Sequence, residues 1–275
     1  MSKKITEFGR KYKNQVEKHK AAFVVFVILR LLVVLAMVIS CISGNYENLF
    51  YCVLTLVLFA LPTFVEKNFG IELPGALEIV ILLFIFAAEI LGEMGSYYTK
   101  IPYWDTMLHT VNGFLCAAIG FAMVDILNRN ERIKFKLAPI FLAVVAFCFS
   151  MTIGVLWEFF EFFCDAFLGM DMQKDFVVST VTSTYLGTST HDPVVLEDIK
   201  NVTVDGIALG VGGYLDIGLY DTMKDLFVNF IGAVVFSVIG FFYVKTRGQG
   251  KLVKQFIPKI KSKNGLPEED ANEKD

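Results

Sequence analysis

The sequence predicts an all-α membrane protein, a six-helix transmembrane bundle with a small extracytoplasmic insertion that is β-rich or irregular. Two observations lead to this fold class. First, 55% of the 275 residues are hydrophobic and the mean hydropathy is +0.57, whereas soluble domains are about 45–50% apolar. Second, the apolar residues gather in six runs, each close to the roughly 20 residues that a helix needs to cross a bilayer.

The six predicted spans differ in length and in the residues that interrupt them. The first carries Arg30 near its middle, the second is short with Pro62 near its end, and the fifth is long enough to tilt in the bilayer. We place the spans at residues 21–42, 49–65, 73–94, 105–127, 137–164 and 225–244.

Positive charge predicts the orientation of these spans, because loops rich in lysine and arginine stay in the cytoplasm. Both tails and the loop of residues 128–136 are basic. Four lysines fall on the opposite side: Lys100, Lys174, Lys200 and Lys224. We therefore expect a multi-pass membrane protein with both termini cytoplasmic. Its parts would be a basic cytoplasmic tail (1–20), spans one to five (21–164), an extracytoplasmic segment (165–224), span six (225–244) and a cytoplasmic tail (245–275).

The extracytoplasmic segment is predicted to form short strands rather than another span. β-Branched residues alternate in 176–185 and 202–207, and glycines punctuate the rest. The segment is also strongly acidic, which suits an aqueous location.

Several classes of function are not indicated. The five cysteines show no CxxC or Cys-His spacing, so neither a disulfide framework nor a zinc site is expected. No phosphate loop, GxSxG elbow, HExxH motif or basic nucleic-acid patch is present. The first apolar run is long enough to remain as an anchor, so we expect no removable signal peptide.

Polar side chains cluster at one end of the predicted spans. With this topology, the ends of spans three and five and the starts of spans four and six share the outer membrane face. Helical spacing puts three groups on single helix faces. These are Asp105, His109 and Asn112; Glu158, Glu161 and Asp165; and Asp221, Asp225 and Asn229. Glu89 and Glu93 close the third span at the same depth. Ionisable groups in a membrane are costly and mark candidate sites.

Six residues form the candidate first shell of a catalytic or binding site: Asp105, His109, Glu158, Glu161, Asp221 and Asp225. Carboxylates with one histidine suit a hard cation such as Mg²⁺ or Ca²⁺, for which Asp105, Glu158, Asp221 and Asp225 are the candidate ligands. Alternatively, one carboxylate acts as a general acid with His109 as its counterpart. Ordinary structural roles compete with both, since Asp105 and Asp221 suit helix starts and Arg30 could pair with a buried acid or with Glu78.

The chain resembles a known family at these residues. Gly92-Glu93-Met94-Gly95 with Asp105-x-x-x-His109, Glu158-x-x-Glu161 and Asp221-x-x-Lys224-Asp225 is similar to the YjdF-like bacterial inner-membrane proteins. The order of a D-x-x-x-H helix, a G-x-x-x-E helix and a D-x-x-x-N-x-x-G helix resembles the VanZ-like membrane proteins. The resemblance covers about residues 73–244 and implies a bacterial plasma membrane, without implying an activity. The long segment between spans five and six departs from the VanZ-like pattern.

Three hypotheses of function follow. The first is an acidic, cation-supported site at the outer membrane face that binds or modifies a lipid-linked or envelope substrate. The second is a transporter, which needs polar groups through the membrane; apart from Arg30 and Glu78, the cytoplasmic halves of the spans are mainly apolar. The third is a structural or assembly protein whose acids fix helix packing. The lipid bilayer is the expected partner, nucleic acid is not, and the sequence leaves the oligomeric state open.

Overall fold

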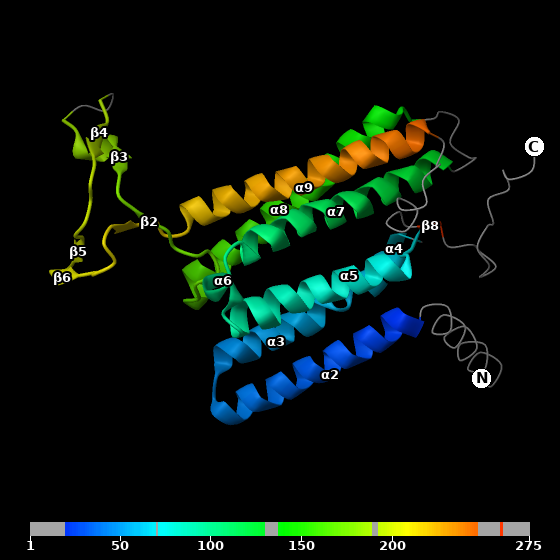
Figure 1. The fold of residues 1–275 in the computed structure, drawn as a ribbon, viewed down its shortest axis with the longest axis horizontal. Helices are drawn as coiled ribbons and strands as arrows, with labels where there is room; N and C mark the ends of the chain where they lie inside the picture. Colours follow the sequence, from blue (N-terminus) through cyan, green and yellow to red (C-terminus); the bar gives the residue numbers. More distant parts are fainter. Residues whose placement is uncertain (1–19, 70, 130–136, 189–191, 247–258, 261–275) are drawn as a thin grey trace, which may run out of the picture. The chain divides into compact units, whose positions relative to one another are not determined.

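Among the residues that the structure describes, six helices are long and apolar enough to cross a membrane, which confirms the predicted fold class. The computed structural model describes residues 20–69, 71–129, 137–188, 192–246 and 259–260 (Figure 1). The spans are Lys20–Ser43, Tyr46–Asn68, Gly75–Met94, Trp104–Asp125, Pro139–Leu168 and Leu219–Lys245. Most of the basic tail (1–20) and of the C-terminal tail (245–275) lies outside the described residues, as does most of the basic loop of residues 128–136.

The first two spans are a helical hairpin followed by a break. Helix α2 (Lys20–Ser43) packs on α3 (Tyr46–Leu58), and the side chain of Asn45 caps α3 by accepting the N–H of Asn48 at 2.9 Å. Helix α4 (Leu61–Phe69) follows with Pro62 in its first turn, where a missing N–H is tolerated. Arg30 of α2 lies over the ring of Phe26, with its Cζ 4.1 Å from the ring centroid.

The third span changes helical type near its end. Helix α5 (Gly75–Phe86) continues into the π-helix η1 (Ala87–Met94), and Gly95 N–H bonds the carbonyl of Ile90 five residues earlier. Ser96 then adopts a positive φ of 58°, and the short helix α6 (Tyr97–Lys100) leads to the fourth span. Because π-helical turns are rare and often occur at functional sites, η1 draws attention to its side chains.

The last three spans contain the longest helices. They are α7 (Trp104–Arg129), α8 (Pro139–Phe163), which continues into the π-helical turn η2 (Cys164–Leu168), and α9 (Leu219–Lys245). Helix α9 begins six residues before the predicted span at residue 225. The predicted boundary followed hydropathy alone, whereas the polar residues of the first turns also continue the helix.

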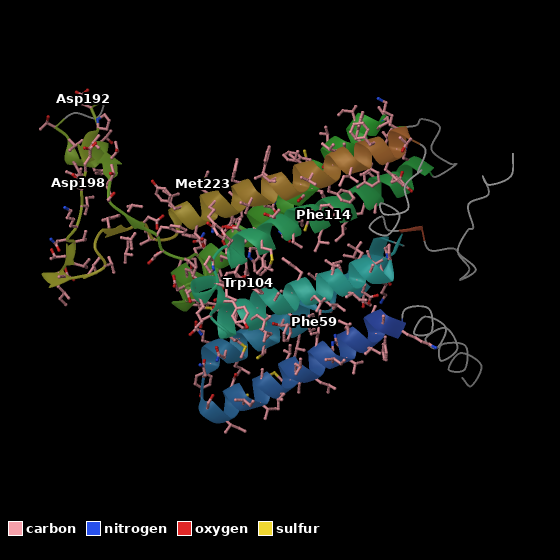
Figure 2. All side chains as sticks on the ribbon, viewed as in Figure 1. Phe59, Trp104, Phe114, Asp192, Asp198 and Met223 are labelled. Carbon is pink, nitrogen blue, oxygen red and sulfur yellow. The ribbon has the colours of Figure 1, made fainter. Side chains whose placement is uncertain are left out.

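The chain divides into two compact units, and the division falls inside α8 and α9. The helical unit comprises Met1–Gly154 and Val228–Asp275, and the insertion unit is Val155–Phe227. In the helical unit, one buried cluster contains Phe59, Leu77 and Leu82, and a second contains Phe121, Leu142 and Phe236. Figure 2 shows Phe59 and Phe114 among the side chains of these helices. Large apolar side chains elsewhere on the spans are exposed, as expected of surfaces that meet lipid.

The insertion unit contains the short strands that the alternation predicted (Figure 1). Strand β2 (Val177–Val178) pairs with β7 (Tyr214–Leu215), β3 (Val181–Ser183) with β4 (Val194–Leu196), and β5 (Thr203–Val204) with β6 (Ile207–Ala208), all antiparallel. The 3-10 turn η3 (Thr184–Leu186) follows β3. Asp205 and Gly206 connect β5 to β6 with φ angles of 52° and 82°, the positive values that a tight type I′ hairpin requires.

One further strand pair lies in the helical unit. Strand β1 (Ile71–Glu72) pairs antiparallel with β8 (Lys259–Ile260). These backbone hydrogen bonds place a short piece of the C-terminal tail beside the connection between α4 and α5.

Candidate functional site

Two of the predicted acids lie on one face near the end of α8, in the insertion unit. Glu158 and Glu161 are three residues apart and both are buried, with exposed fractions of 4% and 8%. The indole Nε1 of Trp157 donates a hydrogen bond to Oε1 of Glu161 at 2.8 Å. Buried carboxylates require hydrogen-bonding or cationic partners, and Trp157 supplies one of them.

The other two predicted site acids in this unit lie in the first turns of α9. Asp225 is 1% exposed and Asp221 is 5% exposed. Lys224 lies between their carboxylates, with its Nζ 3.9 Å from Oδ1 of Asp221 and 3.8 Å from Oδ1 of Asp225. The same Nζ lies 5.7 Å from the ring centroid of Phe176. One lysine therefore faces two buried carboxylates. When both carboxylates are ionised, these three side chains together carry a net charge of about −1.

Asp221 also has a structural task. Its Oδ2 accepts the backbone N–H of Lys174 at 2.8 Å, which ties the chain after η2 to the start of α9. Nearby, the side-chain amide of Gln173 donates to the hydroxyl of Thr222. Asp221 is thus part of a loop-to-helix connection as well as a candidate ligand.

Two further aspartates organise the backbone of the insertion unit. Asp165 in η2 accepts the N–H groups of Met172 and Gln173 at 2.6 and 2.8 Å. Asp216 accepts the N–H of Phe176 at 2.7 Å and that of Tyr220, in the first turn of α9, at 2.6 Å. Both oxygens of each carboxylate are engaged by backbone donors, so these side chains are anchors of the loop.

Negative charge is concentrated around Asp175, outside the spans. Burial raises the pKa of the Asp175 carboxyl group, and the charges of Asp171, Asp216 and Asp165 raise it further. Because the folded state holds this proton more tightly than the unfolded chain, the stability that Asp175 contributes is present at low pH. It is lost as the pH rises through the raised pKa.

The predicted pair on α7 is formed within the helical unit. Nε2 of His109 lies 3.4 Å from Oδ1 of Asp105, one helical turn earlier, and both side chains are half-buried. Each offers a ligand atom of a kind that binds metal ions. Asp105 and His109 therefore lie on one face of α7, as their spacing predicted, because residues four apart meet on a helix surface.

The polar stripe of α7 continues into a packing contact with α9. Nδ2 of Asn112 donates to Oδ1 of Asn229 at 3.1 Å, and Asn229 is 1% exposed. A Cβ added at Gly154 would lie 2.8 Å from Nδ2 of Asn229, and one added at Gly113 would collide with the Asn229 carbonyl oxygen. Glycines at these positions make room for the asparagine, so Asn112 and Asn229 act as a polar contact between closely packed helices.

Three residues that matter locally were not singled out as site residues from the sequence. Lys224 appeared only within a motif, and its place between two carboxylates follows from the helix geometry of α9. Asp216 lies three residues before the first residue of α9, ahead of the usual N-cap position, and its role follows from its hydrogen bonds to Phe176 and Tyr220. Asp125, near the C-terminal end of α7, is buried as well.

Comparison with known proteins supports the membrane assignment. Residues 24–246 match the model of a family described as "Predicted membrane protein (DUF2238)", and the YjdF-like resemblance is consistent with this match. A Thermotoga maritima protein described as uncharacterized is 29% identical over 107 residues, which are 39% of this chain and 53% of the relative. The chain thus spans about half the length of that relative. No solved structure matches the chain.

Proposed function

Because the chain belongs to the DUF2238 family of predicted membrane proteins, we propose that it has an acidic site at the outer face of the plasma membrane. A divalent cation supports this site, and the site binds or modifies a lipid-linked or envelope substrate. The first shell consists of Glu158, Glu161, Asp221 and Asp225 of the insertion unit.

The burial of four carboxylates in the insertion unit is the observation that carries this proposal. Glu158, Glu161, Asp221 and Asp225 are each less than a tenth exposed, while the unit contains only three lysines and no arginine in its sequence. Buried carboxylates repel one another and lose hydration, so a cation lowers the cost of keeping them together. Oxygen ligands of this kind favour Mg²⁺ or Ca²⁺ over softer metals.

The membrane topology supports a common location for these groups. Consecutive spans cross in opposite directions, so the start of the fourth span, the end of the fifth and the start of the sixth face one side. The positive charge of the tails assigns this side to the exterior. The Asp105–His109 pair of the helical unit is a group that can accept or donate a proton.

The substrate class follows from the charge of the site. An anionic headgroup would be repelled by the carboxylates themselves, and a bound divalent cation reverses that repulsion by bridging the acids and a phosphate oxygen. Binding of a lipid that contains a phosphate group should therefore depend on the bound cation.

A structural or assembly role is the second candidate, and a specific observation favours it. The carboxylates of Asp165 and Asp221 accept backbone N–H groups of residues 172–174. These bonds fix the insertion unit at the end of α8 and the start of α9, which is what a docking platform for another envelope protein requires. In that case the acids would stabilise the unit without binding a cation.

Substitution of Asp225 separates the two candidates. We expect Mn²⁺, measured by electron paramagnetic resonance on the purified full-length protein, to bind and to be displaced by Mg²⁺. Asp225→Asn keeps the shape but removes the charge, and it should weaken binding at this site by at least about tenfold. A polyprenyl phosphate should bind only with the cation present. The control is Glu197→Gln, because Glu197 is an exposed carboxylate of the same unit. Unchanged Mn²⁺ and polyprenyl phosphate binding in Asp225→Asn would favour the assembly role.

The proposed orientation predicts which side of the membrane labels a cysteine. In a cysteine-free variant that retains expression, Asp198→Cys should react with a membrane-impermeant maleimide in intact cells. Asp198 lies in the insertion unit and is exposed (Figure 2). Ser262→Cys in the C-terminal tail should react only after the cells are opened. Labelling in the reverse pattern would place the insertion unit in the cytoplasm.

A further inference from the structure

A buried acid in the helical unit is not used by the proposed site. Glu89 lies in η1, within the third span, and only 2% of its surface is exposed. Its Oε2 has no hydrogen-bond partner among the described residues. An isolated carboxylate at such a position is costly, and the surrounding protein does not remove that cost through a hydrogen bond to this oxygen.

Two oxygen-bearing side chains lie close to Glu89. Glu93 is four residues later in the same π-helix, and the two carboxylates influence each other electrostatically. Tyr51, a buried residue of the packed neighbour α3, hydrogen-bonds Glu93 through its side chain and is within electrostatic range of Glu89. Tyrosine donates through its hydroxyl and keeps its oxygen lone pairs. Two carboxylates and one phenolic oxygen therefore belong to two packed elements, η1 and α3.

Two basic side chains of the helical unit have other contacts. Nζ of Lys100 donates to the carbonyl oxygen of Gly95 at 3.1 Å, and the Arg30 guanidinium lies over the Phe26 ring. A helix-capping role does not explain the acids either, because Glu89 and Glu93 lie at the end of the third span, where the helix dipole is unfavourable for negative charge. Oε2 of Glu89 therefore lacks a hydrogen-bond donor among the described residues.

We propose that Tyr51, Glu89 and Glu93 bind a divalent cation in a second site, separate from the acids of the insertion unit. Two carboxylates balance the charge of one such ion, and the tyrosine oxygen and water complete an oxygen coordination shell of the kind that Ca²⁺ and Mg²⁺ accept. The π-helical turn is the local feature that this site explains, because such turns re-aim side chains at functional positions. This inference does not rest on the proposed function.

The test counts bound ions in the full-length protein and its variants. Purified protein in lipid nanodiscs is titrated with Ca²⁺ and with Mn²⁺, and stoichiometry, dissociation constants and the cation-dependent shift in melting temperature are recorded. We expect Glu89→Gln to abolish one class of bound ion while the class sensitive to Asp225→Asn remains. Tyr51→Phe should weaken the Glu89-dependent class by about tenfold, because it removes an oxygen ligand and a hydrogen bond to Glu93.

Each outcome decides between this site and its alternatives. If Glu89→Gln fails to fold, Glu89→Asp retains the charge in a shorter side chain, and the cation should bind it more weakly. Identical stoichiometry and affinity in the wild type, Glu89→Gln and Tyr51→Phe would overturn the proposal. So would a wild-type protein whose melting temperature depends on pH through Glu89 but does not respond to Ca²⁺, Mg²⁺ or Mn²⁺, because the group would then bind only a proton. If the wild type binds the Glu89-dependent ion but shows no class of ion that is sensitive to Asp225→Asn, the cation of the proposed function is contradicted and this second site stands.

Discussion

Alanine at Gly113 or Gly232 is expected to lower the free energy of unfolding by about 1–3 kcal/mol, the cost of overpacking a close contact. A Cβ at Gly113 would collide with the backbone carbonyl oxygen of Asn229, and one at Gly232 with that of Thr110. Backbone atoms cannot rotate away as side chains do, so α7 and α9 would have to separate. Unfolding in mixed micelles, titrated with dodecyl sulfate, measures the loss.

Gly240→Ala is the matched control for these two substitutions. Gly240 lies on α9 as well, but its added Cβ would meet the ring of Phe121, 2.9 Å away. An aromatic ring can shift within its packing, so the loss should be smaller than at Gly113 or Gly232. If all three substitutions lower the free energy of unfolding equally, the close backbone contact between α7 and α9 is not the cause of the loss.

Replacement of Asp216 by alanine should loosen the start of α9 and its connection to the strands. The carboxylate accepts N–H groups from Phe176 and Tyr220, and loss of a capping side chain costs about 0.5–2 kcal/mol. Because about 1.4 kcal/mol corresponds to tenfold in an equilibrium, amide exchange at these two residues should accelerate by about two- to thirtyfold. Hydrogen–deuterium exchange of the full-length protein measures this change.

Asp216→Asn distinguishes the two contributions of the carboxylate. Asparagine retains an acceptor oxygen but not the charge, so it should preserve most of the protection at Tyr220. Fast exchange in Asp216→Asn, as severe as in the alanine variant, would mean that the charge near the helix start is the main factor. Unchanged exchange in Asp216→Ala would contradict the capping role.

The number and approximate positions of the spans could be predicted from the sequence, because the length of an apolar run and the thickness of a bilayer are directly related. The short strands of the insertion were predicted for a similar reason. Alternating β-branched residues indicate strands and glycines mark the turns between them, and both signals are read from a few neighbouring residues. Pro62 was noted near the end of the second span, but the break between α3 and α4 was not predicted. The π-helical turn η1 was not, since the run of residues 73–94 has no local sequence signal for a change of helical type.

The candidate site was predicted less completely than the fold. Pairs on one helix, such as Asp105 and His109, follow from spacing alone. Spacing could not show that Asp221 also binds the backbone of Lys174, or that Asp165 and Asp216 are saturated by N–H donors. Those bonds join residues that are distant in the chain or lie in irregular loops, where no periodicity applies.

Hydropathy and charge by themselves determined that this protein has six spans, and helical spacing determined which polar residues share a helix face. Both properties depend on short stretches of chain and on the membrane as a solvent. Only the tertiary structure decided which acids are buried, which serve as backbone anchors and which, like Glu89, have a carboxylate oxygen with no hydrogen-bond partner among the described residues. Burial and partner choice depend on neighbouring helices and loops, and for this reason the sequence alone could not assign them.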